Sequence, residues 1–143
     1  MKTLQQILND KKHKEVISIA PNRPVFDALV IMAEYRIGAL AVIQDDKLVG
    51  IFSERDYARE VILQGRSSKT TQIHEVMSSK VITATPDDKV DECVNLMSEK
   101  RIRHLPVIQG DKVLGMLSIG DLVKEMLAYQ QRLIKQLENY ILS

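Results

Sequence analysis

The sequence predicts an α/β protein made of two β-α-β-β-α units that pack sheet to sheet about a pseudo-two-fold axis, followed by a long C-terminal helix. Three observations predict this fold. The chain repeats itself without a gap, each copy has the same order of strand-like and helix-like segments, and the last segment continues without glycine or proline. A half of about 60 residues is marginal alone, so we expect the two copies to fold as one unit.

The internal repeat is the strongest of these observations. Shifting the sequence by 65 residues places residues 16–60 on residues 81–125, and 18 of the 45 aligned positions are identical. The identical pairs include Pro21/Pro86, Val25/Val90, Met32/Met97, Gly50/Gly115, Ser53/Ser118 and Asp56/Asp121. An ungapped match of this quality is far above chance, so the chain contains a duplication.

Each copy shows the same series of local patterns. β-Branched runs at 16–19 and 81–84 predict a first strand. Pro21 and Pro86 are expected to open the next helix, because proline is tolerated in a first turn. Apolar residues then recur at helical spacing: Val25, Ala28, Leu29 and Met32, and Val90, Cys93, Val94 and Met97. Turn residues at 45–46 and 110–111 predict a hairpin, and the segments 53–64 and 118–127 predict a second helix.

A short amphipathic segment precedes each copy. Leu4, Ile7 and Leu8 in the first segment correspond to Ile73, Val76 and Met77 in the second. The loop 64–71 joins the copies, and Gly65 is expected to end a helix. We therefore divide the chain into a first unit at 3–66, a second unit at 71–128 and an extended C-terminal helix at 122–143.

The C-terminal segment carries a long apolar stripe. Its residues step by three or four positions, as on one face of a helix: Leu122, Met126, Tyr129, Leu133, Leu137 and Tyr140, widened by Val123, Leu127, Ile134 and Ile141. The first copy has no such extension to cover this face. A partner helix in a homodimer is the expected cover, and packing back onto the same chain is the alternative.

Composition narrows the possible functions. The formal net charge is +1 and aromatic residues make up 4%, which argues against a nucleic-acid surface. One cysteine cannot form an internal disulfide or a cysteine-rich zinc site. The N-terminus lacks the apolar core of a signal peptide, and no apolar run approaches the roughly 20 residues of a membrane helix. We expect a soluble, cytoplasmic protein without membrane or nucleic-acid partners.

Several reactive residue types fit ordinary structural roles. Cys93 falls on an apolar helix face and is expected to be a small buried hydrophobic residue. His13 and His74 are expected to be solvated, and the three histidines lack the spacing of a metal site. No nucleophile-elbow pattern G-x-S-x-G occurs. The sequence therefore predicts no enzyme, no catalytic residue and no metal.

The repeated motif, residues 50–56 and 115–121, has two interpretations. Ser53 and Ser118 are suited to cap a helix, with Asp56 and Asp121 completing a capping box. Capping boxes prefer Glu or Gln at that third position, however, and both copies use the shorter Asp. The carboxylates could instead point outwards and accept both hydroxyls of a ribose. Free amides at the helix start would favour phosphates, and glycines 50 and 115 would let a ligand approach the backbone.

Basic residues are placed differently in the two copies. Arg103 and His104 stand where the first copy has Gly38 and Ala39, at the entrance of a strand. The first copy instead has Arg55, where the second has Gly120. These basic residues could bind a phosphate, which arginine can hold with two parallel hydrogen bonds. The alternative interpretation is ordinary surface charge at a solvated strand end. If the copies face each other, Arg55, Arg103 and His104 converge on one central cleft.

These residues resemble the CBS domain (named for cystathionine β-synthase), and the duplication resembles its tandem pair, the Bateman module, in small stand-alone bacterial proteins. The resemblance covers residues 3–125. It implies a regulatory, non-catalytic module that binds AMP, ADP, ATP, NAD(H) or S-adenosylmethionine and commonly forms a homodimer. AMP and NAD are the ligands we expect, with no catalytic cofactor. The alternative is a ligand-free dimerisation or adaptor module, which the presence of both Asp56 and Asp121 disfavours.

The resemblance also implies two sets of site residues. In similar proteins the motif Asp holds the ribose, the first strand and hairpin entrance flank the adenine, and basic residues reach the phosphates. One predicted site comprises Ser18, Ile37, Gly38, Ser53, Arg55 and Asp56. The other comprises Thr83, Ala84, Arg103, His104, Ser118 and Asp121. Because residues 38 and 39 offer no phosphate ligand, the first site is expected to depend on Arg55, to bind a less charged ligand, or to stay empty.

Overall fold

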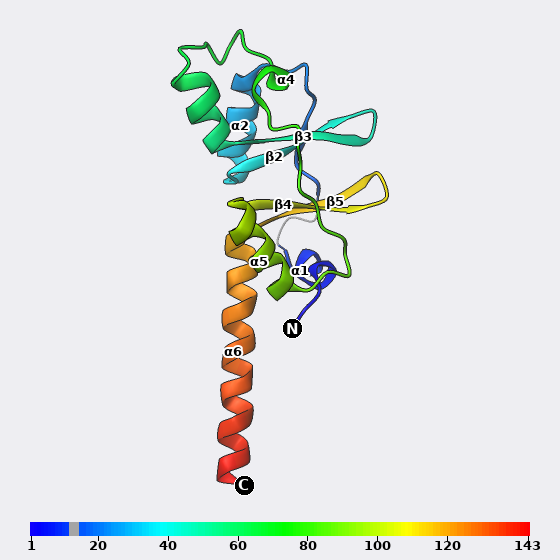
Figure 1. Ribbon diagram of the computed structural model, residues 1–143, viewed down its shortest axis with the longest axis vertical. Helices are drawn as coiled ribbons and strands as arrows, with labels where there is room; N and C mark the ends of the chain where they lie inside the picture. Colours follow the sequence, from blue (N-terminus) through cyan, green and yellow to red (C-terminus); the bar gives the residue numbers. More distant parts are fainter. Residues whose placement is uncertain (12–14) are drawn as a thin grey trace.

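A computed structural model describes residues 1–11 and 15–143, and in it the two copies lie one above the other with their hairpins adjacent (Figure 1). The first half has β1 (Ser18–Ile19), α2 (Val25–Tyr35), β2 (Ala39–Gln44), β3 (Lys47–Ser53), α3 (Glu54–Asp56) and η1 (Tyr57–Ile62). The second half has α5 (Val90–Lys100), β4 (His104–Gln109), β5 (Lys112–Ser118) and α6 (Ile119–Leu142). Helices α1 (Leu4–Asp10) and α4 (Ile73–Val76) precede the halves. The predicted α/β class and pseudo-symmetric arrangement are confirmed.

The two hairpins form where the turn residues predict them. Strand β2 pairs antiparallel with β3, and β4 pairs antiparallel with β5. Asp45 and Asp46 both have positive φ, as a type I′ turn requires, whereas Gly110 alone supplies the positive φ of the second turn. Both ladders shift register at the same place, beside Gly50 and Gly115. The duplication therefore extends to the irregularities of the sheets.

The first strand is present in only one half. β1 pairs parallel with β2, but the predicted strand at 81–84 is reduced to a single bridge between Ala84 and Val107. Ala84 donates to the carbonyl of Pro106 and accepts from the N–H of Ile108, at 2.9 and 2.8 Å. The next bond would need an N–H from Pro106, which proline lacks, so the ladder cannot extend towards residue 82.

Helices α2 and α5 begin later than predicted. They start at Val25 and Val90, four residues after Pro21 and Pro86, so the expectation that these prolines open the helices is wrong. Each proline carbonyl instead accepts a hydrogen bond from the start of a short helix. His74 N donates to Pro21 O at 2.9 Å, and Gln5 N donates to Pro86 O at 3.0 Å. The prolines thus dock α4 and α1.

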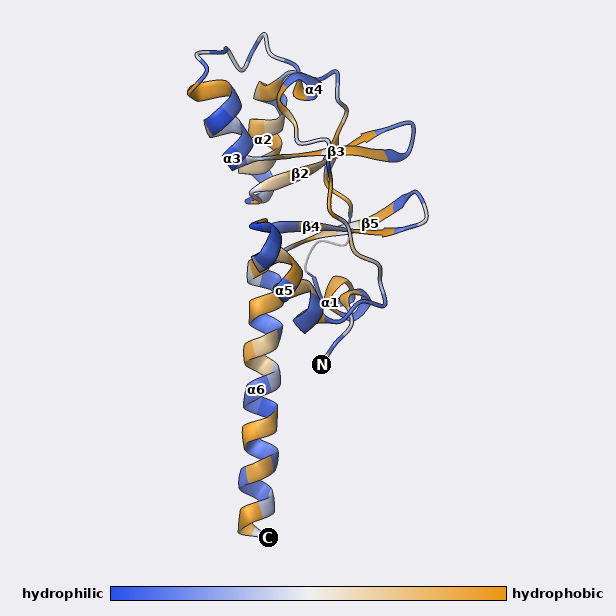
Figure 2. Ribbon diagram, viewed as in Figure 1, coloured by the Kyte–Doolittle hydropathy of each residue, from blue (hydrophilic) through white to orange (hydrophobic). Residues whose placement is uncertain are grey.

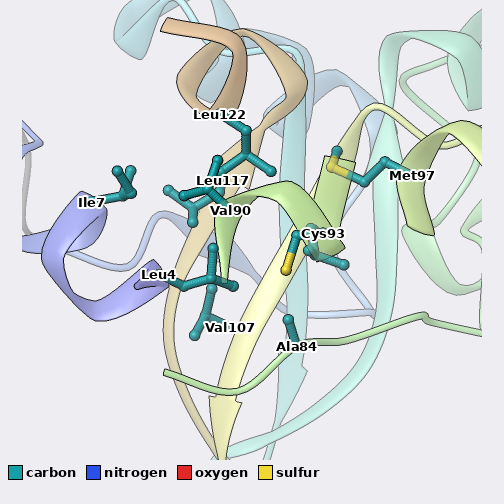
Figure 3. Packing of buried hydrophobic residues seen from close by; sticks show 10 residues of the cluster. Leu4, Ile7, Ala84, Val90, Cys93, Met97, Val107, Leu117 and Leu122 are labelled. Atoms are coloured by element: carbon teal, nitrogen blue, oxygen red, sulfur yellow. The ribbon is translucent and has the colours of Figure 1, made fainter. Parts of the chain in front are cut away.

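The two short helices are exchanged between the halves. Leu4 and Ile7 of α1 lie in the core of the second half, with Val90, Cys93 and Leu122 among their neighbours (Figure 3). Ile73 and Val76 of α4 lie in the core of the first half instead. The sequence-based units placed each helix with the copy that follows it, whereas the packing places each with the other copy. Neither half has a complete core from its own contiguous segment.

The helix faces expected to be apolar are buried. Val25, Ala28 and Met32 face one core, and Val90, Cys93 and Met97 face the other. Burial, with the nearby Asp88 carboxylate, raises the pKa of the Cys93 thiol to about 11. The expectation that Cys93 is a buried hydrophobic residue is confirmed, since so high a pKa keeps it a neutral thiol.

The second helices of the two halves diverge. The first continues from α3 into the π-helical segment η1, with Leu63 N bonded to Ala58 O and Arg66 N to Val61 O, and ends near Gly65 at φ +68°. The second is the 24-residue α6, which extends far beyond the domain (Figure 1). Every residue from 130 to 143 is exposed, so the C-terminal part does not pack back on the described residues. Apolar and polar residues alternate along it (Figure 2).

Candidate functional site

The motif serine and aspartate form a capping box in both halves. Ser53 N donates to Asp56 Oδ2 at 2.9 Å, and Asp56 N donates to Ser53 Oγ at 3.2 Å. Ser118 and Asp121 make the same two bonds at the same two distances. The capping interpretation is therefore confirmed for both serines. One carboxylate oxygen of each aspartate serves the cap, and the surroundings of the two aspartates differ.

At the Asp56 end, the chain following α4 covers the motif. Ser78 exchanges backbone hydrogen bonds with Ile51 of β3, both at 2.9 Å, and its hydroxyl donates to Asp56 Oδ1 at 3.1 Å. A β-carbon on Gly50 would lie 2.6 Å from Met77 Sδ and 3.0 Å from Ser78 O. Gly50 therefore admits residues 77–78 of the chain. Both oxygens of Asp56 already accept protein hydrogen bonds.

At the Asp121 end, a cavity of about 420 Å³ opens beside the motif. We call it the Asp121 cavity. Its polar lining includes Lys11, Glu15, Arg36, His104, Ser118 and Asp121, and its apolar lining includes Leu8, Ile17, Ile37, Ala39, Leu114 and Met116. Lys11 Nζ donates to Asp121 Oδ2 at 3.1 Å and to Met116 O at 3.0 Å. Among the described residues, no donor reaches the other Asp121 oxygen, Oδ1.

A second hollow of about 650 Å³ adjoins this cavity. The two share Arg36, Ile37, Gly38, His104 and Ser118 in their linings. Arg103 and Glu54 line the second hollow, together with apolar residues of α2. The contact across the halves is close, because a β-carbon on Gly38 would lie 3.4 Å from His104 Nε2. The two hollows thus lie side by side between the halves, and we call them together the recess.

The structure combines the predicted site residues differently from the two predicted sets. Ile37 and Gly38, assigned to the Asp56 set, line the Asp121 cavity with His104, Ser118 and Asp121. Arg103 lines the adjoining hollow. The remaining predicted residues line neither hollow among the described residues: Ser18, Ser53, Arg55, Asp56, Thr83 and Ala84. Regrouping occurs because the strand entrances at residues 38 and 104 meet each other across the two stacked halves.

Arg55 does not join Arg103 and His104 in the recess. Its Nη1 donates to the carbonyl of Arg101 at 3.1 Å, on the exposed surface between the halves. The expected convergence of these three basic residues on one cleft is therefore wrong for Arg55 in this structure. Ala84 is also unsuited to a direct side-chain contact with a ligand, because it is buried in the core of the second half.

Electrostatics favour an anionic Asp121 and a neutral His104. Burial on its own raises the pKa of Asp121, but the Ser118 N–H and the Lys11 ammonium together hold it below its ordinary value. Burial lowers the pKa of His104, outweighing the nearby carboxylates of Glu54 and Asp121. A phosphate beside His104 would favour its protonated form, so the ring is suited to respond to an anion.

Two residues of the recess were missed by sequence reasoning. Lys11 lies far from the motif in sequence, and only the docking of α1 on the second half brings it to Asp121. Arg36 ends α2 at φ +55°, and its repeat equivalent Arg101 ends α5 at the same φ. Glycine or asparagine is usual in this left-handed position, so an arginine at both helix ends was a signal that could have marked Arg36.

Metal ligands are not clustered in the described part of the chain. Within residues 1–11 and 15–143, no group of three His, Cys, Asp or Glu side chains could hold a metal ion. His74 is exposed, as predicted, and its Nε2 lies 2.7 Å from Gln72 Oε1. His13 falls outside the described residues. No helix in the described part of the chain is both long and apolar enough to cross a membrane.

The comparisons with known proteins agree on one family. The family model described as "CBS domain" matches residues 10–63 and 73–128. The chain is 42% identical over 122 residues to the mitochondrial CBS domain-containing protein CBSX3 of Arabidopsis thaliana. That match covers 82% of this chain and 59% of the plant protein, so the chain spans less than two thirds of this relative.

Solved structures give the same result. A protein with CBS domains from Burkholderia ambifaria superimposes with a TM-score of 0.85 at 48% identity, covering 89% of this chain and 95% of the other. The CBS domain pair of protein MJ0100, solved with 5′-methylthioadenosine and S-adenosyl-L-methionine, gives a TM-score of 0.80 at 27% identity, covering 90% and 98%. Both the sequence and the fold therefore match proteins with paired domains of one type.

Proposed function

The chain belongs to the CBS-domain family, with the domain present twice, and from this membership we propose that it is a regulatory module that binds an adenosine nucleotide of the AMP, ATP or NAD class. The observation that carries the proposal is the Asp121 cavity. It combines apolar walls, an ionised carboxylate with one oxygen free of donors from the described residues, and the cationic side chains of Lys11 and Arg36. The adenosine ligands of the MJ0100 pair support the same ligand class.

Each part of the cavity suits one part of such a ligand. Ile17, Ile37 and Ala39 offer an apolar surface for adenine. Asp121 can accept hydrogen bonds from the ribose hydroxyls, as acidic residues do in dinucleotide sites. Lys11 and Arg36 line the same cavity and can pair with phosphates, His104 can take up a proton beside one, and Arg103 adds a positive charge in the adjoining hollow. The positive charges of Lys11, Arg36 and Arg103 favour a phosphate ester over the positively charged sulfonium of S-adenosylmethionine.

The two motif aspartates provide a matched test. Asp121→Asn and Asp56→Asn both retain a side-chain oxygen that can cap the helix, so both variants are expected to fold. Thermal melting of nucleotide-stripped protein against AMP, ATP, NAD and S-adenosylmethionine measures binding. A ligand at about 100 times its Kd adds roughly 2.7 kcal/mol of stability, a shift of several degrees.

We expect Asp121→Asn to abolish this shift and Asp56→Asn to retain it. The reason is that both oxygens of Asp56 already accept hydrogen bonds from Ser53 and Ser78. A flat response of the wild type to the whole panel would contradict nucleotide binding. Nucleotide recovered unchanged after prolonged incubation is also expected, because in this proposal the chain binds its ligand without converting it.

We also propose that the module acts as a homodimer through α6. Its exposed apolar residues include Leu127, Ile134, Leu137 and Ile141. About four turns of isolated helix are marginal in water, so this segment needs a partner to stay helical. A second copy would supply an identical stripe, and a ligand would regulate the dimer by binding two arrangements with different affinity.

Light scattering after gel filtration tests the dimer. Ile134→Glu places a charge in the stripe and should yield monomers, whereas Lys135→Glu changes the polar face and should not. A wild-type monomer at micromolar concentration would contradict the dimer. A wild-type dimer combined with no nucleotide response would favour the alternative function, a ligand-free adaptor that acts through α6.

A further inference from the structure

Lys11 is held in place at the edge of the Asp121 cavity. It directly follows α1, and its backbone N–H donates to Leu8 O at 3.3 Å. The helix itself is anchored by Leu4, which is fully buried in the core of the second half (Figure 3). The flexible side chain then bridges Asp121 and the carbonyl of Met116. Both members of the ion pair remain partly exposed, at 31% and 29%, so solvent and ligands can reach them.

The ion pair conflicts with ribose binding at the same carboxylate. Asp121 Oδ2 already accepts the Ser118 N–H at 2.9 Å and the Lys11 ammonium at 3.1 Å. A ribose presents two adjacent hydroxyls, and a two-point contact with one hydroxyl on each carboxylate oxygen uses Oδ2, whose two lone pairs are already occupied, as well as Oδ1. A nucleoside that makes both contacts therefore displaces Lys11 and leaves the ammonium without its carboxylate partner.

A phosphate on the ligand gives the displaced Lys11 ammonium a new anionic partner. The lysine stem is long and rotatable, and its ammonium is a compact charge that binds phosphate oxygens well. Resting on the nucleotide-binding function proposed above, we propose that Lys11 determines the preference of the Asp121 cavity for phosphorylated adenosine ligands over adenosine. In the free protein it holds Asp121, and in the complex it turns to the phosphate while the ribose takes the carboxylate.

The other half of the chain provides a matched control residue. The correspondence of Leu4, Ile7 and Leu8 with Ile73, Val76 and Met77 is a shift of 69 residues, which places Lys11 on Lys80. Lys80 is exposed, and the residue that contacts Asp56 is Ser78. A charge change at Lys80 alters the net charge equally but leaves the Asp121 cavity unchanged.

Titration calorimetry of the full chain with AMP and with adenosine tests the proposal. We expect Lys11→Met to lower the ratio of AMP affinity to adenosine affinity by about tenfold or more, as the loss of one charge-assisted hydrogen bond predicts. In Lys11→Met, the affinity for AMP should fall, whereas the affinity for adenosine should equal or exceed that of the wild type. Lys11→Arg should keep most of the preference, and Lys80→Met should leave both affinities unchanged.

Two results would overturn this role of Lys11. One is an unchanged ratio of AMP affinity to adenosine affinity in Lys11→Met, which includes an equal loss for both ligands, and the other is the same change of the ratio in Lys80→Met. An equal loss for both ligands would show that Lys11 only positions Asp121. Wild-type protein that binds neither AMP nor adenosine would overturn the proposed function first, and that outcome is visible before any variant is made.

Discussion

The Asp56 and Asp121 ends of the molecule contain the same motif and the same capping box, yet only the Asp121 end borders the cavity among the described residues. The difference lies in the segment that reaches each motif. Residues after α4 reach the Asp56 motif, and residues after α1 reach the Asp121 motif. The helices correspond by a shift of 69 residues and the repeat bodies by 65, so the link after α1 is four residues longer than the link after α4.

This difference in link length changes what meets each aspartate. After α4, the short link pairs Ser78 with β3 and brings its hydroxyl to Asp56. After α1, Lys11 reaches Asp121 with its side chain, and the cavity remains beside it. A duplicated motif is therefore a duplicated helix start, and its availability to a ligand depends on the segment that crosses it.

The largest expected effect comes from weakening the packing of α1 and α4 in the cores that receive them. Leu4→Ala and Ile73→Ala each truncate a fully buried side chain, so each should lower the free energy of unfolding by about 2–5 kcal/mol. Only Leu4→Ala should also weaken AMP binding, because Lys11 directly follows α1. Urea denaturation measures the first effect and calorimetry the second. A loss below about 1 kcal/mol in either variant would contradict the exchanged packing.

The equivalent glycines should respond unequally to a methyl group. Gly50→Ala would clash with Met77 Sδ at 2.6 Å and with the backbone oxygen of Ser78 at 3.0 Å. Gly115→Ala would meet the end of the flexible Leu8 side chain, at 2.7 Å. We expect a loss of about 1–3 kcal/mol for Gly50→Ala and a smaller one for Gly115→Ala, from paired thermal melts. Equal losses would mean that both motifs are covered alike.

His104 should make the free energy of unfolding moderately dependent on pH. The equivalent residue in the first half is Ala39, which does not titrate. Because burial lowers the pKa of His104, the unfolded chain takes up the proton first. Its contribution to stability is thus complete above the ordinary pKa of 6.5 and is lost as the pH falls from there towards the lower folded pKa. Urea denaturation at pH 8 and pH 5.5 should show a smaller difference in His104→Gln than in the wild type. An identical difference would contradict the burial of this ring.

The smallest effect is expected at Arg55. Its hydrogen bond to Arg101 O lies on the exposed surface, so Arg55→Ala should change the free energy of unfolding by no more than about 0.5 kcal/mol. AMP affinity should also stay within twofold, because Arg55 does not line either hollow. A large loss of AMP affinity in this variant would restore the sequence-based expectation that Arg55 serves a ligand.

Local features of the fold were predictable because neighbouring residues determine them. The turns at Asp45–Asp46 and Gly110, the capping serines and the apolar faces of α2 and α5 all lie where the patterns indicate. Helices α2 and α5 start later than predicted, and the carbonyls of Pro21 and Pro86 bind α4 and α1 instead. The strand predicted at 81–84 is cut short by Pro106, which lies in β4, so its effect appears only when the partner strand is known.

The sequence by itself determined the duplication, the family, the two hairpins and the serines that cap the helix after each hairpin, because these depend on short-range geometry and on repetition. Only the tertiary structure decided which core receives each short helix, since α1 and α4 have similar apolar patterns. It also brought Ile37 and Gly38 to Asp121, and placed Lys11 there but Ser78 at Asp56. These pairings depend on the length of the links and on how the two halves stack. Both act between residues far apart in the sequence, so local sequence patterns do not reveal them.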